Sequence, residues 1–104
     1  MTLTKYERGS TFKTTVTWMS SSTYVDPSGQ KSYLDVYDSL GTKIFDSVEG
    51  SKESTGIYKY YVSTNSTDPL GVYVVDWWAR FNYGTPWNYE TKHERSEIQI
   101  SYLD

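Results

Sequence analysis

Apolar and polar side chains alternate along much of this chain, and no stretch shows the 3.6-residue apolar period of a helix. One run covers residues 11–19, whose first face carries Phe12, Thr14, Val16 and Trp18. Another covers residues 72–81, whose apolar face carries Tyr73, Val75, Trp77, Ala79 and Phe81. A period of two residues is typical of a strand with one buried face, so both runs are predicted to be strands.

Five further segments have the same strand character. They are residues 3–7, 31–38, 42–46, 57–63 and 94–102. Their predicted inward side chains are Leu34, Val36, Tyr58, Tyr60, Val62, Ile98, Ile100 and Tyr102. The intervening segments are rich in Gly, Pro, Ser and Asn and are predicted to be loops or turns, namely residues 20–30, 47–55, 65–70 and 82–91.

Seven short strands and no crossover helix favour antiparallel pairing. A chain of 104 residues has the size of one domain. We therefore expect a single all-β domain over residues 1–104, a seven-stranded antiparallel Greek-key sandwich of the immunoglobulin-like type. A small barrel is the alternative.

Composition and charge limit the partners. Aromatic residues make up 17% of the chain, with eleven Tyr and four Trp, which is strand composition. The net charge is −3 and the ten Lys and Arg are scattered, so no nucleic-acid binding is expected. No apolar stretch approaches 18 residues and residues 1–6 lack a signal-peptide core, so neither membrane insertion nor a signal peptide is expected.

The residues needed for catalysis are scarce. His93 is the only histidine, there is no cysteine, and no Gly-x-Ser-x-Gly motif occurs. We expect no enzyme activity, no catalytic residue, no metal site and no cofactor. His93 is predicted to be solvated where the last strand starts. Asp76 lies in mid-strand on the outward face, and is expected to meet solvent, Arg80 or a lysine on a neighbouring strand.

Two Gly-x-Tyr triplets, at Gly56 to Tyr58 and Gly71 to Tyr73, are predicted to be structural. A glycine before a strand allows a positive φ or a close approach. A tyrosine two residues later can bury its ring and donate its hydroxyl to a nearby carbonyl. Trp18 and Trp77 are predicted to belong to the same structural set.

These triplets also carry a resemblance. Together with residues 8–12, 36–42 and 74–79, they are similar to small immunoglobulin-like domains of phage, archaeal virus and prokaryotic surface proteins, and also to the macroglobulin-type sandwich. The likeness runs from about Arg8 to Tyr102. It implies a virion or cell-surface structural role and supplies no catalytic residues.

Candidate binding residues gather near the predicted loop of residues 82–91. They are Tyr83, Trp87 and Tyr89 within it, Trp78 on the preceding strand, and Tyr24 in another loop. Large exposed aromatics serve as anchors for a protein partner or as stacking platforms for a sugar. Trp87 could equally close the open end of the sandwich. The outward faces add Tyr33, Tyr37 and Tyr61.

These observations favour a non-enzymatic structural module of a virion head or tail, or of a surface assembly. It would dock a protein partner or assemble with itself through its end loops and an aromatic sheet face. The alternative is a carbohydrate-binding module that stacks a polysaccharide on Trp and Tyr. Genomic neighbours that encode capsid or tail proteins would favour the first hypothesis.

Overall fold

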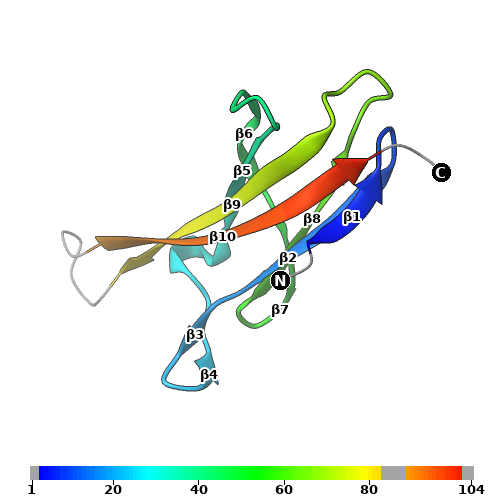
Figure 1. Cartoon of the computed structure of the whole chain (residues 1–104). Helices are drawn as coiled ribbons and strands as arrows, with labels where there is room; N and C mark the ends of the chain where they lie inside the picture. The colour runs from blue at the N-terminus through cyan, green and yellow to red at the C-terminus, as the bar shows by residue number, and fades with distance from the viewer. Residues whose placement is uncertain (1–2, 83–88, 102–104) are drawn as a thin grey trace.

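The computed structural model describes residues 3–82 and 89–101, except for the side chains of Asn82 and Tyr89. These residues form strands and one short 3-10 turn, without any α-helix among them (Figure 1). The prediction of an all-β fold is confirmed.

The larger sheet has five strands in the order β1-β10-β9-β5-β6. Their bounds are β1 Thr4–Glu7, β10 Tyr89–Ser101, β9 Gly71–Asn82, β5 Tyr33–Tyr37 and β6 Lys43–Glu49. β1 pairs with β10 in parallel, and the other neighbours are antiparallel. The prediction of antiparallel pairing throughout is therefore wrong at this edge. No crossover helix is needed here because the whole intervening chain connects the two strands.

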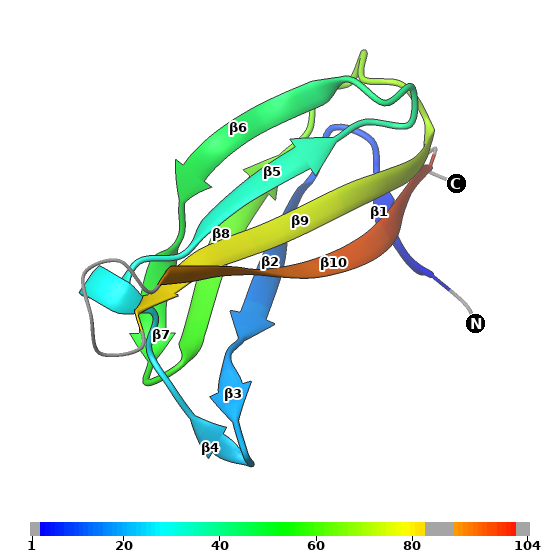
Figure 2. The same cartoon turned by 90° about the vertical axis from the view of Figure 1, so that its left-hand side faces the viewer.

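The second sheet has three strands in the order β2-β8-β7, and it lies behind the first (Figure 2). Its members are β2 Thr11–Thr17, β8 Ile57–Ser63 and β7 Ser51–Ser54. The predicted loop of residues 20–30 holds more structure than expected. The strands β3 Met19–Ser20 and β4 Thr23–Tyr24 form a small hairpin there, and the 3-10 turn η1 spans Ser28–Gln30.

Both sheets contribute to one hydrophobic core. The second sheet and the residue after β2 provide Phe12, Val16, Trp18, Tyr58 and Val62. The larger sheet provides Leu34, Val36, Tyr73, Val75, Trp77, Ala79, Phe81, Ile98 and Ile100. The alternation predicted for these strands is confirmed, although Tyr60 is only half-buried and Tyr102 lies outside the described residues.

The predicted loop of residues 47–55 is mostly strand. β6 continues to Glu49, and β7 follows after the single residue Gly50. The chain passes from one sheet to the other at this glycine. All four side chains of β7 are exposed, so the segment lacks the apolar alternation that marks a strand in the sequence.

The predicted loop of residues 82–91 is also shorter than expected. β9 runs to Asn82 and β10 begins at Tyr89, so residues 83–88 alone separate them. The early part of β10 was missed because its inward positions carry polar side chains. Glu90, Lys92 and Glu94 lie opposite the buried Phe81, Ala79 and Trp77.

Gly56 and Tyr58 connect the small hairpin to the second sheet. Gly56 has φ +75, and a Cβ there would stand 2.8 Å from the carbonyl oxygen of Trp18. The carbonyl oxygen of Gly56 accepts a hydrogen bond from the backbone amide of Trp18 at 2.8 Å. The hydroxyl of the buried Tyr58 donates to the carboxylate of Asp26 at 3.0 Å, rather than to a carbonyl.

Gly71 and Tyr73 lie at the start of β9. Gly71 has φ +128, and a Cβ there would stand 2.8 Å from Cβ of Ser39. Tyr73 is fully buried and its hydroxyl donates to the carbonyl of Pro69 at 2.5 Å. The two residues thus fix the corner at which the chain enters β9.

Both core tryptophans have a partner for the indole N–H. Nε1 of Trp18 donates to Oγ of the buried Ser32 at 2.9 Å, and its ring meets Phe81 edge-on at 5.5 Å. Nε1 of Trp77 donates across the core to Oγ1 of Thr14 at 3.0 Å. The second bond links the two sheets directly.

Candidate functional site

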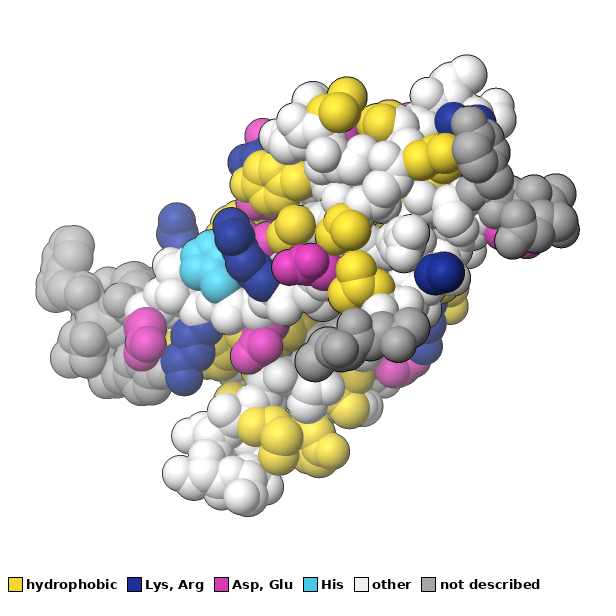
Figure 3. Space-filling view, in the orientation of Figure 1, with side chains coloured by type: hydrophobic (Ala, Val, Ile, Leu, Met, Phe, Trp, Pro, Cys, Tyr) yellow, Lys and Arg dark blue, Asp and Glu magenta, His cyan; other side chains and the backbone are white. Residues whose placement is uncertain are grey.

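The outer face of the larger sheet collects most of the chemically active side chains that the structure describes. Strand register puts Tyr33, Trp78 and His93 in one row across β5, β9 and β10. The next row is Asp35, Asp76 and Arg95. Figure 3 views the molecule as in Figure 1, and its histidine, drawn in cyan, lies among basic, acidic and hydrophobic side chains.

The first row contains a stacked aromatic pair. The rings of Tyr33 and Trp78 lie 4.8 Å apart between centroids, with 25° between their planes. Both side chains are half-buried, and both sit on strands in the interior of the sheet. A site built on paired strands holds its geometry better than one on a loop. The pair is therefore a firm aromatic platform.

A shallow pocket of about 410 Å³ adjoins this platform. Its lining residues are Ser28, Lys31, Tyr33, Trp78 and Arg80. No ion pair joins Lys31 or Arg80 to any residue in the described part of the chain. The pocket thus combines aromatic rings with two cations that can meet a ligand.

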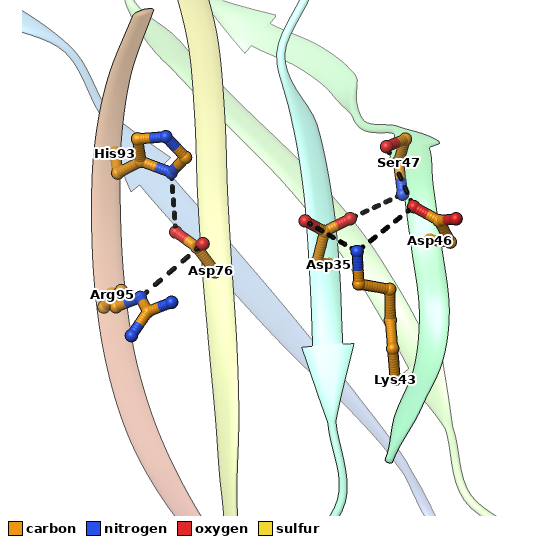
Figure 4. A network of polar contacts seen from close by, with 7 residues as sticks. All are labelled: Asp35, Lys43, Asp46, Ser47, Asp76, His93 and Arg95. Carbon is orange, nitrogen blue, oxygen red and sulfur yellow. Dashed lines mark hydrogen bonds and ion pairs between the residues drawn. The ribbon is translucent and has the colours of Figure 1, made fainter. Parts of the chain in front are cut away.

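The second row sets two buried carboxylates opposite each other. Asp35 and Asp76 are direct partners across β5 and β9, and they are 8% and 4% exposed. Like charges in this position destabilise a sheet unless cations offset them. Each carboxylate is bonded on its own side, as Figure 4 shows.

The bonds of the two carboxylates are separate. Asp76 lies 3.2 Å from Nδ1 of His93 and 3.6 Å from Nε of Arg95. Asp35 accepts the amide N–H of Ser47 at 2.7 Å and lies 3.8 Å from Nζ of Lys43. The expected partners of Asp76 were wrong, because β10 extends further than expected: Arg95 lies directly opposite Asp76, and His93 lies within the strand, diagonally across from it.

Nδ1 of His93 is bonded to Asp76, and among the described residues no nucleophile is bonded to this histidine. Within residues 3–82 and 89–101, His, Cys, Asp and Glu do not gather in threes as metal ligands. The arrangement is therefore two separate sets of polar contacts beside a platform suited to binding, one that joins β9 to β10 and one that joins β5 to β6.

A second exposed feature is the β3–β4 hairpin, which projects from the body in Figures 1 and 2. Met19 and Tyr24 are paired across it, and they are 49% and 52% exposed. Its two-residue turn has positive φ at Ser21 (49°) and Ser22 (68°), which is the geometry of a type I′ turn. The hairpin presents an apolar pair of residue types that are enriched at protein interfaces.

The base of the hairpin is held by the carboxylate of Asp26. It accepts hydrogen bonds from Nζ of Lys52 and the amide of Gly56, both at 2.8 Å, besides that of Tyr58. The Lys52 bond, followed by the Gly56 bond, lowers the pKa of the Asp26 carboxyl below its ordinary value. Burial, together with this anionic neighbour, raises the pKa of Tyr58. The bonds fix the start of the hairpin to the turn before β8.

Two of the five predicted binding residues can be placed with their side chains. Trp78 lies in the platform and Tyr24 on the hairpin, on separate parts of the surface. Tyr83 and Trp87 lie outside the described residues. For Tyr89 only the backbone is described, as the first residue of β10.

The sequence did not single out Tyr33, Lys31, Arg80 or Ser28 as site residues. Tyr33 was noted only as an outward aromatic, and its contact with Trp78 depends on the register of β5 against β9. The signal that could have found the pocket is the spacing of alternating residues. Lys31 and Tyr33, in the segment that leads into β5, have the same parity, as do Trp78 and Arg80 on β9.

Among the described residues no helix is long and apolar enough to cross a membrane. Comparison of the chain with protein-family models, with curated proteins and with solved structures finds no match. The site must therefore be interpreted from its own geometry.

Proposed function

We propose that this chain is a non-enzymatic structural and interaction module built on an immunoglobulin-like sandwich. Counting β6 and β7 as one strand that changes sheets at Gly50, and the β3–β4 hairpin as an insertion, leaves seven principal strands. That number supports the description. The module would be a component of a virion head or tail, or of a cell-surface assembly. It would dock a protein partner on the outer face of the larger sheet and through its end loops.

The observation that supports this proposal best is the Tyr33–Trp78 stack on interior strands. Aromatic anchors beside a charged rim are the usual composition of a protein interface. Here the rim is formed by the exposed His93 and Arg95, which the buried Asp76 holds in place. The exposed Met19 and Tyr24 give the hairpin a similar character.

The test uses the products of the genes that flank the gene for this chain. Each purified product is passed over the immobilised chain, and binding is measured by interferometry. We expect one product to bind, and Trp78→Ala to weaken its binding at least tenfold. Tyr61→Ala is the matched control, because Tyr61 is an exposed aromatic of the other sheet. Binding that survives both Trp78→Ala and Tyr24→Ala would contradict the proposal.

A specific observation favours a second candidate, a module that binds acidic polysaccharide. The pocket at the platform sets Lys31 and Arg80 beside two aromatic rings. A sugar ring can stack on an aromatic face, while a uronate carboxylate can bond to Arg or Lys. Neutral sugars would make only the stacking contact.

Tryptophan fluorescence separates the two candidates. Polygalacturonate and alginate are titrated against the chain, with dextran as the neutral control. If the chain binds acidic polysaccharide, polygalacturonate and alginate should each change the fluorescence in a saturable way. Lys31→Ala and Trp78→Ala should each abolish that change. An unchanged spectrum with all three polymers would remove this candidate and leave the protein-docking proposal intact.

A further inference from the structure

One edge of the larger sheet is only partly covered. β10 has thirteen residues, and β1 pairs with four of them, Ile98 to Ser101. The other nine residues, Tyr89 to Glu97, pair with β9 on one side and have no neighbouring strand among the described residues on the other. A free edge of this length leaves a row of backbone N–H and C=O groups that a further strand can bond.

The seam between the sheets is open beside this edge. A hollow of about 280 Å³ is lined by Thr15, Val16, Thr17, Trp77, Glu94, Arg95 and Ser96. It lies between β10 and β2, which is the edge strand of the second sheet. The free edge therefore borders the core rather than a closed surface.

The charges along the free edge match those of a second copy of the same edge when the two run antiparallel. In an antiparallel pair with a two-fold axis at His93, Lys92 of one copy lies opposite Glu94 of the other, and this pair occurs twice. Opposite charges that face each other across strands stabilise the pairing. The same register aligns Tyr89 with Glu97, so the pairing ends next to Leu3, which lies beside Ser96 and Glu97 just before β1.

We infer that a second copy of this chain adds to the free edge of β10 in this register and forms a two-fold dimer with a continuous sheet. Lys92 and Glu94 both have inward parity, since they lie opposite Ala79 and Trp77. A two-fold axis perpendicular to the sheet keeps inward side chains on one face, which is what their pairing requires. Moving the axis by one residue, to Lys92 or to Glu94, would set two like charges against each other on the axis.

The inward charges also explain why the partner is a copy of the chain. Charged side chains on an edge strand disfavour pairing with an unmatched strand. They therefore select a partner with the complementary order of charges. In both views the β3–β4 hairpin projects on the side of the free edge, so each hairpin would reach toward the other copy and bring Met19 and Tyr24 to the contact (Figures 1 and 2).

Charge exchange at the edge tests the inference. The mass of the full chain is measured by sedimentation from micromolar to millimolar concentration, with circular dichroism to show that each variant folds. We expect a dimer for the natural sequence. Lys92→Glu and Glu94→Lys should each raise the dissociation constant at least tenfold, because each creates two like-charge pairs. Lys5→Glu, a change of the same charge on an exposed residue of β1, should leave it unaltered.

A double variant and a mixture of the two single variants make the test specific. The double variant Lys92→Glu with Glu94→Lys should dimerise again, and the two single variants should form a heterodimer when mixed, since their charges then match. A chain that stays monomeric at millimolar concentration would overturn the inference, as would a dimer that neither single variant weakens. Binding of a flanking-gene product to the immobilised chain is a separate measurement. A chain that does not dimerise would therefore leave the proposed docking at Trp78 unaffected.

Discussion

Gly50 lies against the ring of Trp77 at the point where the chain passes between the sheets. A Cβ at residue 50 would stand 2.6 Å from ring atoms Cη2 and Cζ3, and 3.1 Å from the carbonyl oxygen of Lys59. Gly50→Ala is therefore expected to lower the free energy of unfolding by about 1–3 kcal/mol, the usual cost of overpacking. Urea unfolding measures the loss. Gly41→Asn is the control, because nothing lies within 4 Å of that position and Asn tolerates its φ of +84. Equal stability of both variants with the natural chain would contradict the packing assigned to Gly50.

Thr14 satisfies the indole N–H of Trp77 in the core. Thr14→Val keeps the shape of the side chain but removes the oxygen, and leaves a buried donor without its partner. We expect the free energy of unfolding to fall by about 1–3 kcal/mol. Thr15→Val, on the exposed face of the same strand, should change it by less than about 0.5 kcal/mol. Thermal unfolding of the pair gives the comparison, and a loss in Thr15→Val as large as in Thr14→Val would argue against the bond.

Asp26 should make stability depend on pH. Its pKa is lowered in the folded chain by Lys52 and Gly56, so the folded state favours the ionised form. That contribution is fully present above the ordinary carboxyl pKa of about 3.9 and is lost as pH falls through the lower folded value. Asp26→Asn is expected to reduce stability at pH 7 and to flatten its fall below about pH 4. Denaturant unfolding from pH 2 to 7 tests this, with the exposed Asp46→Asn as the control. An unaltered acid slope would refute the role of Asp26.

The hairpin turn should accept a better sequence. Ser21 and Ser22 both hold positive φ, which costs an L-residue free energy, whereas Asn-Gly is the preferred pair of a type I′ turn. Ser21→Asn with Ser22→Gly is expected to raise the free energy of unfolding by about 0.5–2 kcal/mol. The melting temperature should therefore rise. The control is Ser20→Asn with Thr23→Gly, which places the same residues in the flanking strands and should lower it. A drop in melting temperature for the turn variant would show that the serines make contacts worth keeping.

Alternation predicted the interior of this protein well. The buried faces of β2, β8 and β9 follow directly from the sequence, because each places its apolar residues two apart. The corner at Gly71 and Tyr73 could also be predicted, since a positive φ and a buried hydroxyl leave few residue choices. The alternation of apolar and polar residues was sufficient to predict a strand wherever one face of that strand packs against the core.

Features that depend on neighbours in space could not be predicted. β7 and the start of β10 carry polar side chains on both faces, so nothing in the pattern separates them from loops. The parallel pairing of β1, the bond between Asp76 and His93, and the stack of Tyr33 on Trp78 all depend on strand order and register. The alternation of side chains within a single strand specifies neither the strand order nor the register.

The parallel pairing of the first and last strands has a mechanical consequence. Pulling on the two flanks of the chain would drag β1 and β10 along each other in opposite senses, because residues 4–7 and 98–101 run side by side in one direction. Their hydrogen bonds would then bear the load together in shear, rather than opening one after another. A module held by its two flanks in a particle or a surface fibre would resist extension at this short strand pair first, before its core is exposed.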